Sequence, residues 1–263
     1  MRATLSRRLV SATWITREMN LAYRIKERPP ARSITEEVRV GLVDVRFGPV
    51  RMEGPFNHQP ISSGTRMEAI LGPDASNVSR QYVPGTRTNG NSLREFMTAL
   101  VQDSYTKDWK AGHLLNEELG GDGQNAANLT PLTSKANSAH KSFESHIKRM
   151  LLQCHRIDRE DKACTHWYGV EYKVQVSHDR YSAPFDADLI DSYVALFISI
   201  EYKYIKIEKA RFPFLVKQDV AGNDPKIQTL TRADPPVYSS TNVKSVRRNG
   251  IGTEFFAEIH NQD

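Results

Sequence analysis

Residues 134–153 constrain the fold of this chain most strongly, because they read as one long helix with a single apolar side. The segment contains no glycine or proline, and Thr133 or Ser134 can cap its first turn. Its apolar residues recur at spacings of three, four and seven: Ala136, Phe143, Ile147, Met150 and Leu151. At about 100° per residue these positions form one stripe. We therefore expect a helix that packs this stripe against the body of the protein.

Three polar residues lie beside this stripe. Asn137, His140 and Glu144 fall within about 60° of one another around the helix axis. Polar side chains at the edge of a buried face can point into a cleft. They can also be ordinary boundary residues with solvated side chains, and on the helix alone this second interpretation is the simpler one. The residues before the helix favour a site.

Those preceding residues predict two strands joined by a glycine-rich loop. Residues 108–115 read as a short strand in which Gly112 allows close backbone approach just before His113. Residues 119–123 are rich in glycine, and residues 128–131 form an extended piece that Pro131 separates from the helix. We expect a compact strand–loop–strand–helix unit whose first strand delivers His113 opposite the helix face bearing Asn137.

The stretch 109–144 resembles the DNA/RNA non-specific endonuclease family, the ββα-metal nucleases of the His-Asn type that include the Serratia nuclease. It resembles still more closely the nuclease domains at the ends of bacterial polymorphic toxins. Asn137 matches the family's metal-binding asparagine and Glu144 its helical glutamate. The family elements Asp-Arg-Gly-His and Asn-Leu-Ser-Pro are matched by Gly112-His113, at the end of the first, and by Asn128-Leu129-Thr130-Pro131.

Two positions depart from the family pattern. Ala111 stands where members carry an arginine, so any phosphate contact of that arginine must come from another residue. Candidates are the neighbouring Lys110 and three arginines, Arg66, Arg80 and Arg87. Glu144 follows Asn137 by seven residues, where eight are expected. We interpret both departures as marks of the toxin branch.

The resemblance implies a metal-dependent endonuclease that hydrolyses phosphodiester bonds of DNA, with RNA as a further substrate. His113 would act as general base on the attacking water. Mg²⁺ or Mn²⁺ would be held by Asn137 directly and by Glu144 through an oriented water. The expected catalytic residues are His113, Asn137 and Glu144, the expected substrate-binding residues are Lys110, Asn116 and His140, and Gly112 and Asn128 are expected to give structural support.

Three classes of function fit these residues. The first is a bacterial toxin effector that is made in the cytoplasm, acts in a target cell and has a cognate immunity protein in the producer. The second is a nutritional or housekeeping nuclease with the same chemistry. The third is a catalytically inactive nucleic-acid-binding module of the same fold, for which Ala111 is the hint. Because the catalytic residues are all present, we favour a nuclease over the binding module.

Charge divides the chain unevenly. The net charge is +5, but residues 1–35 hold eight basic residues against Glu18 and Glu27, a balance of +6, so the remainder is −1. We expect residues 1–35 to be a basic lead segment, flexible or partner-docking; they lack the apolar core of a classical signal peptide, and no stretch is long enough to span a membrane. On the expected helix, Lys135, Lys141, Lys148 and Arg149 could form a phosphate track or only a solvated face.

The pattern as a whole predicts an α+β fold in which a central antiparallel sheet carries a ββα-metal, HNH-like unit. We expect a nuclease domain at 36–210 with its motif at 108–150, and an irregular C-terminal extension at 211–263 packed on it. Strands are expected at 38–47, 66–71, 169–176 and 193–207, with one more near 253–259. A helix through residue 104, begun by the capping box of Ser92 and Glu95, should turn Leu93, Met97, Leu100 and Val101 inward.

Two cysteines and two histidines form a second cluster: Cys154, His155, Cys164 and His166. Such ligands could hold structural zinc, but their spacing fits no common zinc finger. A disulfide is the other alternative. We favour free thiols over both, so the cysteines do not identify a redox compartment.

Overall fold

The structure, a computed structural model, describes residues 40–56, 59–73, 93–103, 108–182, 184, 186, 188–211, 216–220, 224–228, 243–249 and 254–261. By its contacts the chain divides into two compact units, Met1–Glu37 and Val38–Asp263. All of the described residues belong to the second unit, so the expected lead segment lies outside them.

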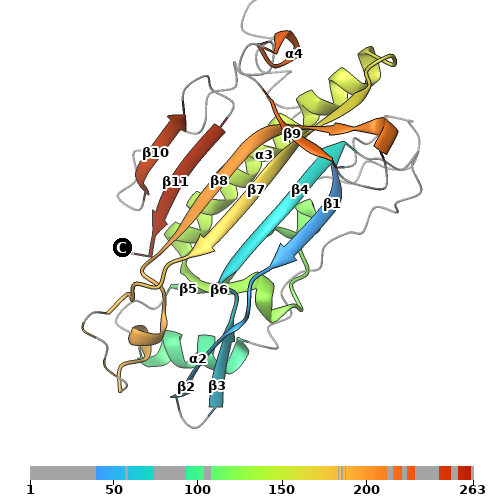
Figure 1. Cartoon of the computed structure of the whole chain (residues 1–263). Coiled ribbons are helices and arrows are strands. Elements are labelled where there is room, and N and C mark those ends of the chain that lie inside the picture. Colours follow the sequence, from blue (N-terminus) through green and yellow to red (C-terminus); the bar gives the residue numbers. More distant parts are fainter. Residues whose placement is uncertain are drawn as a thin grey trace, which may run out of the picture. The chain divides into compact units, whose positions relative to one another are not determined.

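A large antiparallel sheet forms the body of the second unit (Figure 1). Its strands lie in the order β1-β4-β7-β8-β11-β10, and a short strand, β9, also pairs with β8. The side chains of the central strands alternate, so that Tyr172, Val174, Ile200 and Tyr202 are buried on one face. The strands are β1 (Val40–Phe47), β4 (Arg66–Pro73), β7 (His166–Val176), β8 (Phe197–Glu208), β9 (Lys217–Asp219), β10 (Val243–Asn249) and β11 (Glu254–His260).

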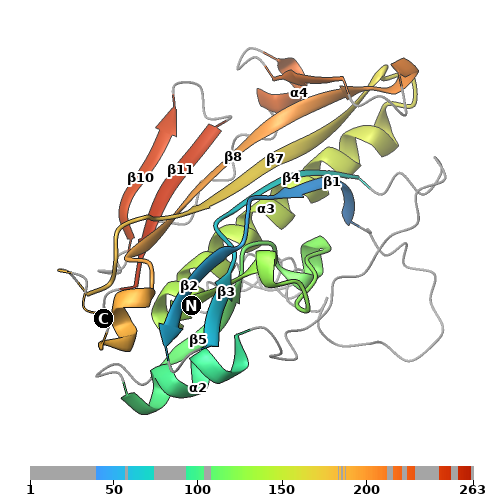
Figure 2. The same ribbon diagram turned by 60° about the horizontal axis from the view of Figure 1, so that its bottom comes forward.

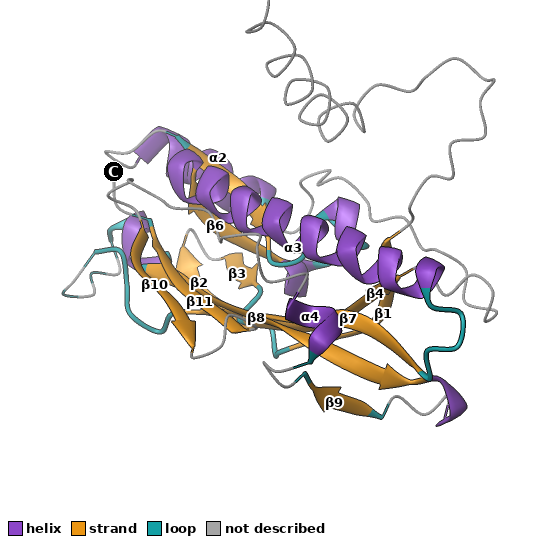
Figure 3. Cartoon of the chain, turned by 90° about the horizontal axis from the view of Figure 1, so that it is seen from above, coloured by secondary structure: helices purple, strands orange, loops and turns teal. Residues whose placement is uncertain are grey.

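Helix α3 (Ser134–Glu160) lies along the buried face of this sheet, mainly on β7 and β4 (Figure 3). Its N-cap is Thr133, whose Oγ1 accepts a hydrogen bond from the N–H of Ala136 at 3.3 Å. All five residues of the expected apolar stripe are buried. The helix runs past the expected end at Gln153, because buried Cys154 and the partly buried Ile157 continue the stripe.

The opposite face of the sheet is charged and paired. Glu171 on β7 lies beside Lys173, Lys203 and Lys217, and Lys203 also bonds Asp219 at 2.9 Å. On β4, Arg66 pairs with Glu68. These cations are therefore engaged by carboxylates of the same or a neighbouring strand.

A smaller assembly adjoins one end of the sheet. It contains a two-stranded sheet of β5 (Trp109–His113) and β6 (Leu129–Thr133), the hairpin of β2 (Arg51–Phe56) and β3 (Gln59–Ser63), and helix α2 (Arg94–Asp103) (Figure 2). A second apolar cluster joins the region of α2 to the β5–β6 sheet, with Leu93, Phe96 and Leu100 packed against Trp109 and Leu129. The remaining short helices are η3 (Glu117–Leu119), η4 (Ala126–Asn128), η5 (Ile190–Tyr193), η6 (Lys209–Arg211) and α4 (Pro225–Gln228).

The α+β class with a central antiparallel sheet is confirmed, while several details were predicted wrongly. Val101 is 39% exposed and lines a pocket between α2 and β5, so it is not buried in the core. The strand expected at 193–207 begins only at Phe197, because Tyr193 ends the short helix η5. The strand expected near 253–259 is present as β11, which pairs with β8 over seven residues. β10 was not expected and pairs with β11, so these described parts of the tail complete the sheet and are not irregular. Among the described helices none is both long and apolar enough to cross a membrane.

Candidate functional site

His113 ends strand β5, opposite Leu129 of β6. Its side chain is partly exposed. The preceding Gly112 lies against the buried Leu132, and a Cβ added to this glycine would come within 2.5 Å of Leu132 Cδ1. The glycine immediately before the histidine therefore leaves room for the Leu132 side chain between the two strands.

After His113 the chain forms a compact loop, residues 114–128, whose ends meet through the Leu114 N–H and the Asn128 carbonyl at 2.7 Å. Asn128 is fully buried and holds the loop from inside. Its Oδ1 accepts from the Leu115 N–H at 2.8 Å, and its Nδ2 donates to the carbonyls of Leu115 and Asp122, each at 3.0 Å. A Cβ at Gly121 would lie 1.7 Å from the Leu115 oxygen, so only glycine fits there. This bonding fixes the position of Asn116.

Asn116 forms two hydrogen bonds with the carboxylate of Glu144 on α3. The backbone N–H and the Nδ2 of Asn116 each donate to one carboxylate oxygen, both at 3.0 Å, while the Oδ1 of Asn116 accepts from the Glu118 N–H at 2.9 Å. Glu144 is only 2% exposed. Burial raises the pKa of Glu144 to about 8, against the opposing effects of the Asn116 hydrogen bonds and the nearby Lys141 charge.

His140 lies one helical turn before Glu144 and is also buried, with 1% exposure. Its Nε2 is 2.5 Å from the hydroxyl of Tyr172 on β7. Burial, together with the charge of the nearby His113, lowers the pKa of His140 to about 4. Burial raises the pKa of Tyr172, and so does the charge of Glu144. Both partners of this hydrogen bond are therefore neutral at pH 7.

Asn137 and Lys141 form the open side of this arrangement. Asn137 is partly exposed, and its side chain makes no hydrogen bond within the described part of the chain. Lys141, one turn later, is exposed and close enough to Glu144 for its charge to act on that carboxylate. Residues 113–116 and the first three turns of α3 thus approach each other at two points, His113 with His140 and Asn116 with Glu144.

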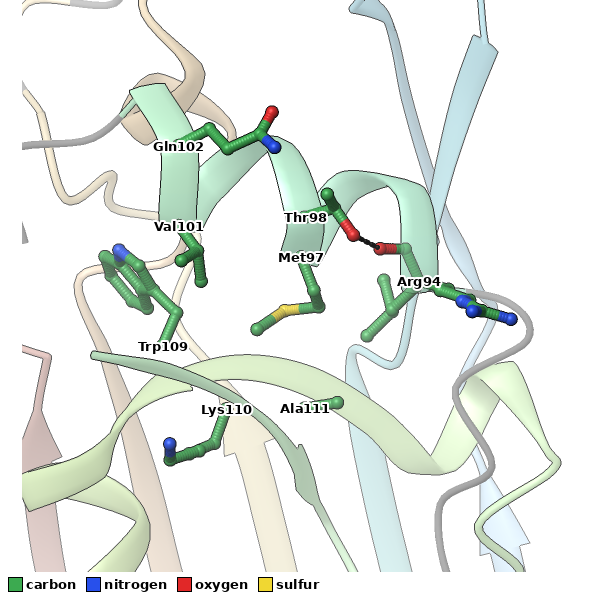
Figure 4. Close-up of a pocket in the computed structure, with 9 residues that line it drawn as sticks. Arg94, Met97, Thr98, Val101, Gln102, Trp109, Lys110 and Ala111 are labelled. Atoms are coloured by element: carbon green, nitrogen blue, oxygen red, sulfur yellow. Dashed lines mark hydrogen bonds between the residues drawn. The ribbon is translucent and has the colours of Figure 1, made fainter. Parts of the chain in front are cut away.

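The three residues expected to bind substrate are buried or bonded to other side chains of the protein. His140 is too deeply buried for direct contact with phosphate in this conformation, and Asn116 is engaged with Glu144. Lys110 pairs with Asp108 at 3.2 Å and lines a pocket of about 450 Å³ between α2 and β5. Figure 4 shows Met97 and Val101 of α2 directed toward β5 across this pocket.

Of the three arginines considered as replacements for the one that the family carries at position 111, the structure describes only Arg66. Arg66 pairs with Glu68 and alternates with the core residue Met67, so it lies on the sheet face away from α3. Arg80 and Arg87 lie outside the described residues.

The cysteine–histidine cluster spans the end of α3 and the start of β7. Cys154 is buried, Cys164 is half-buried, and both are free thiols. His166 Nδ1 lies 2.9 Å from the Thr165 hydroxyl. Across the described ranges, no three His, Cys, Asp or Glu side chains form a group that could hold a metal ion.

Sequence reasoning missed Tyr172 as a partner in the site. No local pattern marks this tyrosine, which alternates with other buried residues of β7 as an ordinary core position. Its contact with His140 joins residues 32 apart in the sequence, a separation at which pairing depends on the sheet and not on periodicity.

Comparison of the chain with protein-family models, with curated proteins and with solved structures finds no match in any of the three.

Proposed function

We propose that this protein is a metal-dependent endonuclease that hydrolyses phosphodiester bonds of DNA, and also of RNA, at a site formed by His113, Asn137 and Glu144. The observation that carries the proposal is the Glu144 carboxylate. It is buried two turns after the partly exposed Asn137, on the same flank of α3, and is oriented by two hydrogen bonds from Asn116. Burying an ionisable group costs free energy that hydrogen bonds only partly offset, and carboxylates with a perturbed pKa often lie at functional sites.

In the proposed reaction His113 accepts the proton of the water that attacks the phosphorus, a role that suits a partly exposed histidine. His140, uncharged at pH 7, adds no second positive charge beside His113. Asn116 positions Glu144, whose carboxylate would orient a water held by the metal ion.

The donor groups fit a hard divalent cation. Asn137 has an amide oxygen free of hydrogen bonds to the described residues, and Glu144 supplies an oriented carboxylate behind it. Mg²⁺ prefers such oxygen ligands and keeps most of its water, so one amide with an outer carboxylate suffices. When bound, the ion would neutralise charge that develops on the phosphate and on the leaving oxygen. A positive ion here would also favour the ionised form of Glu144.

The test is digestion of plasmid DNA by the full chain with Mg²⁺, with EDTA, and after substitution of His113. We expect Mg²⁺-dependent cleavage that His113→Ala abolishes and Asn116→Ala reduces by roughly 10- to 100-fold. The matched control is His166→Ala, a partly exposed histidine at the start of β7, which should cleave at the wild-type rate. Undiminished cleavage by His113→Ala would overturn the assignment, and intact DNA with tight binding would favour the inactive binding module.

We further propose that the nuclease acts as a bacterial effector restrained by an immunity protein, which is what the resemblance to toxin domains supports. Expression of the wild-type chain in a bacterial host should then arrest growth, and His113→Ala should relieve the arrest. Normal growth during expression of an enzyme that is active in vitro would instead favour a nutritional nuclease.

A further inference from the structure

The outward face of α3 carries a row of exposed cations. Between its first residue and Ile157 the helix contains a single acidic residue, Glu144, and that one is buried. The solvent-facing positions therefore hold no negative charge over more than six turns, at about 3.6 residues per turn. The exposed basic residues of this row, called here the α3 track, are Lys135, Lys141, Arg149 and Arg156, and the exposed Ser138 and Ser145 lie between them.

The α3 track differs from the charged cluster around Glu171 in that its cations have no carboxylate partners among the described residues. None of the four makes an ion pair with the residues that the structure describes. By contrast Lys148, on the flank of the same helix, pairs with Glu118. The lysines on the far face of the sheet are likewise paired. An unneutralised row of positive charge suits a ligand that brings its own row of negative charge.

The charge and length of the α3 track indicate which ligand. Residues 36–263 carry a net charge of −1, so the track is a local concentration of positive charge and not part of a generally basic surface. From Lys135 to Arg156 the helix rises by about 30 Å, close to one turn of duplex DNA. Lys141 lies one turn beyond Asn137 and beside Glu144, so the track begins at the candidate site.

We propose that the α3 track binds the phosphate backbone of a nucleic acid, with Lys141 as the contact nearest to the phosphate that reacts. This inference rests on the proposed function for the identity of the ligand. It also gives the site a phosphate contact that the sequence lacks at Ala111. Binding can be measured without cleavage, so the two proposals can fail separately.

The experiment measures binding of a fluorescein-labelled 20-base-pair duplex to the full chain by anisotropy in EDTA, over a series of salt concentrations. The His113→Ala protein serves as the reference. Adding Lys141→Gln, Arg149→Gln and Arg156→Gln should lower the slope of log K against log salt by about 2.7, at about 0.9 per phosphate contact. At moderate salt the dissociation constant should rise on the order of 100-fold.

The matched control removes three exposed cations elsewhere, with Arg46→Gln, Arg94→Gln and Arg211→Gln in the same background. These changes should leave the slope nearly unaltered. Equal losses in the two triple variants, or no loss in the α3 track variant, would overturn the inference even if the enzyme cleaves DNA. If the slope decreases only in the α3 track variant and the wild-type chain does not cleave DNA, the inference about the α3 track holds and the nuclease assignment is wrong. Far-ultraviolet circular dichroism checks that each variant is folded.

Discussion

Two ionisable side chains are buried one turn apart on the same helix, and burial shifts their pKa values in opposite directions. The pKa of Glu144 rises to about 8, and that of His140 falls to about 4. In both cases burial favours the uncharged form. Each side chain nevertheless has a specific partner, Asn116 for Glu144 and Tyr172 for His140. A core made only for stability would have used apolar residues at these two positions.

The depressed pKa of His140 predicts sensitivity to acid. The unfolded chain takes up this proton near the ordinary value of 6.5, whereas the folded protein does not until about 4. At His140 the unfolded state therefore binds more protons between these values, a contribution that lowers the free energy of unfolding by up to about 1.4 kcal/mol per unit as pH decreases. The raised pKa of Glu144 acts in the opposite direction over the same range, so the prediction concerns the difference between two proteins. In urea unfolding at pH 7, 5.5 and 4.5, the stability of the wild type relative to His140→Gln should decrease as pH falls. A constant difference between the two proteins would contradict it.

For single residues, the sequence predicted which side of helix α3 a side chain occupies, but not which residue it contacts. Counting along the helix placed Asn137, His140 and Glu144 on one flank, and all three lie there. The same counting suggested that His140 faces solvent and phosphate, but it is buried against Tyr172. A position at the edge of a helix is open or closed depending on what covers it, and β7 covers His140.

Among the elements of the structure, the loop of residues 114–128 does most to fix the position of a site residue. It has little regular structure beyond two short helices, and Asn128 supplies three hydrogen bonds that tie it together. The loop then presents both donors of Asn116 to Glu144. A loop that positions a site in this way must be rigid, so Asn128 has a larger part in the site than its distance from the chemistry would suggest.

We expect Asn128→Ala to destabilise the protein by about 3 kcal/mol, since it leaves buried backbone groups of Leu115 and Asp122 without partners. The amides of residues 115–121 should also exchange hydrogen faster. Asn125→Ala is the control, because Asn125 is partly exposed and its side chain caps a short helix through one bond at 3.0 Å to the Ala127 N–H. It should cost about 1 kcal/mol. Similar costs and similar exchange in the two variants would refute a special role for Asn128.

The sequence predicted elements best where periodicity is long. Helix α3 and strands β1, β4 and β7 lie close to their expected positions. The hairpin of β2 and β3 was not predicted, and neither was β10. These strands are short or rich in charged and polar residues, so their stability comes from the neighbouring strand and not from a local pattern.

At the scale of the whole molecule, the residue that follows β11 connects that strand to other parts of the core. Asn261 is fully buried and accepts from the Thr133 N–H at 3.0 Å, and its Nδ2 donates to the carbonyls of Ala195 at 2.9 Å and Pro131 at 3.4 Å. Thr133 is the N-cap of α3, so one side chain connects the last strand of the chain, β6 and the start of the helix that bears the site. A tail expected to be an appendage therefore belongs to the core.

Replacing Asn261 by alanine should lower the free energy of unfolding by about 3 kcal/mol, because three buried backbone groups lose a partner. Urea denaturation measures this directly. A change below about 0.5 kcal/mol, the usual range for surface substitutions, would mean that the C-terminal residues are not structurally coupled to β6.

The order of strands in the sheet could not be read from the sequence. β11 pairs with β8 across more than 40 intervening residues, and β4 pairs with β7 across almost 100. Local patterns specify that a strand forms and which of its faces is apolar, but they do not specify its neighbour. The joining of Asn116 to Glu144 likewise depends on how the loop folds back onto the helix.

The most direct test of the central claim is digestion of plasmid DNA and of total RNA, side by side, by the wild-type protein and by His113→Ala, each with Mg²⁺ and with EDTA. We predict that the wild-type protein degrades DNA only with Mg²⁺ and that the variant degrades nothing; the RNA lanes give the sugar preference. Intact DNA and RNA in every lane, or cleavage that persists without His113, would contradict the account of this site.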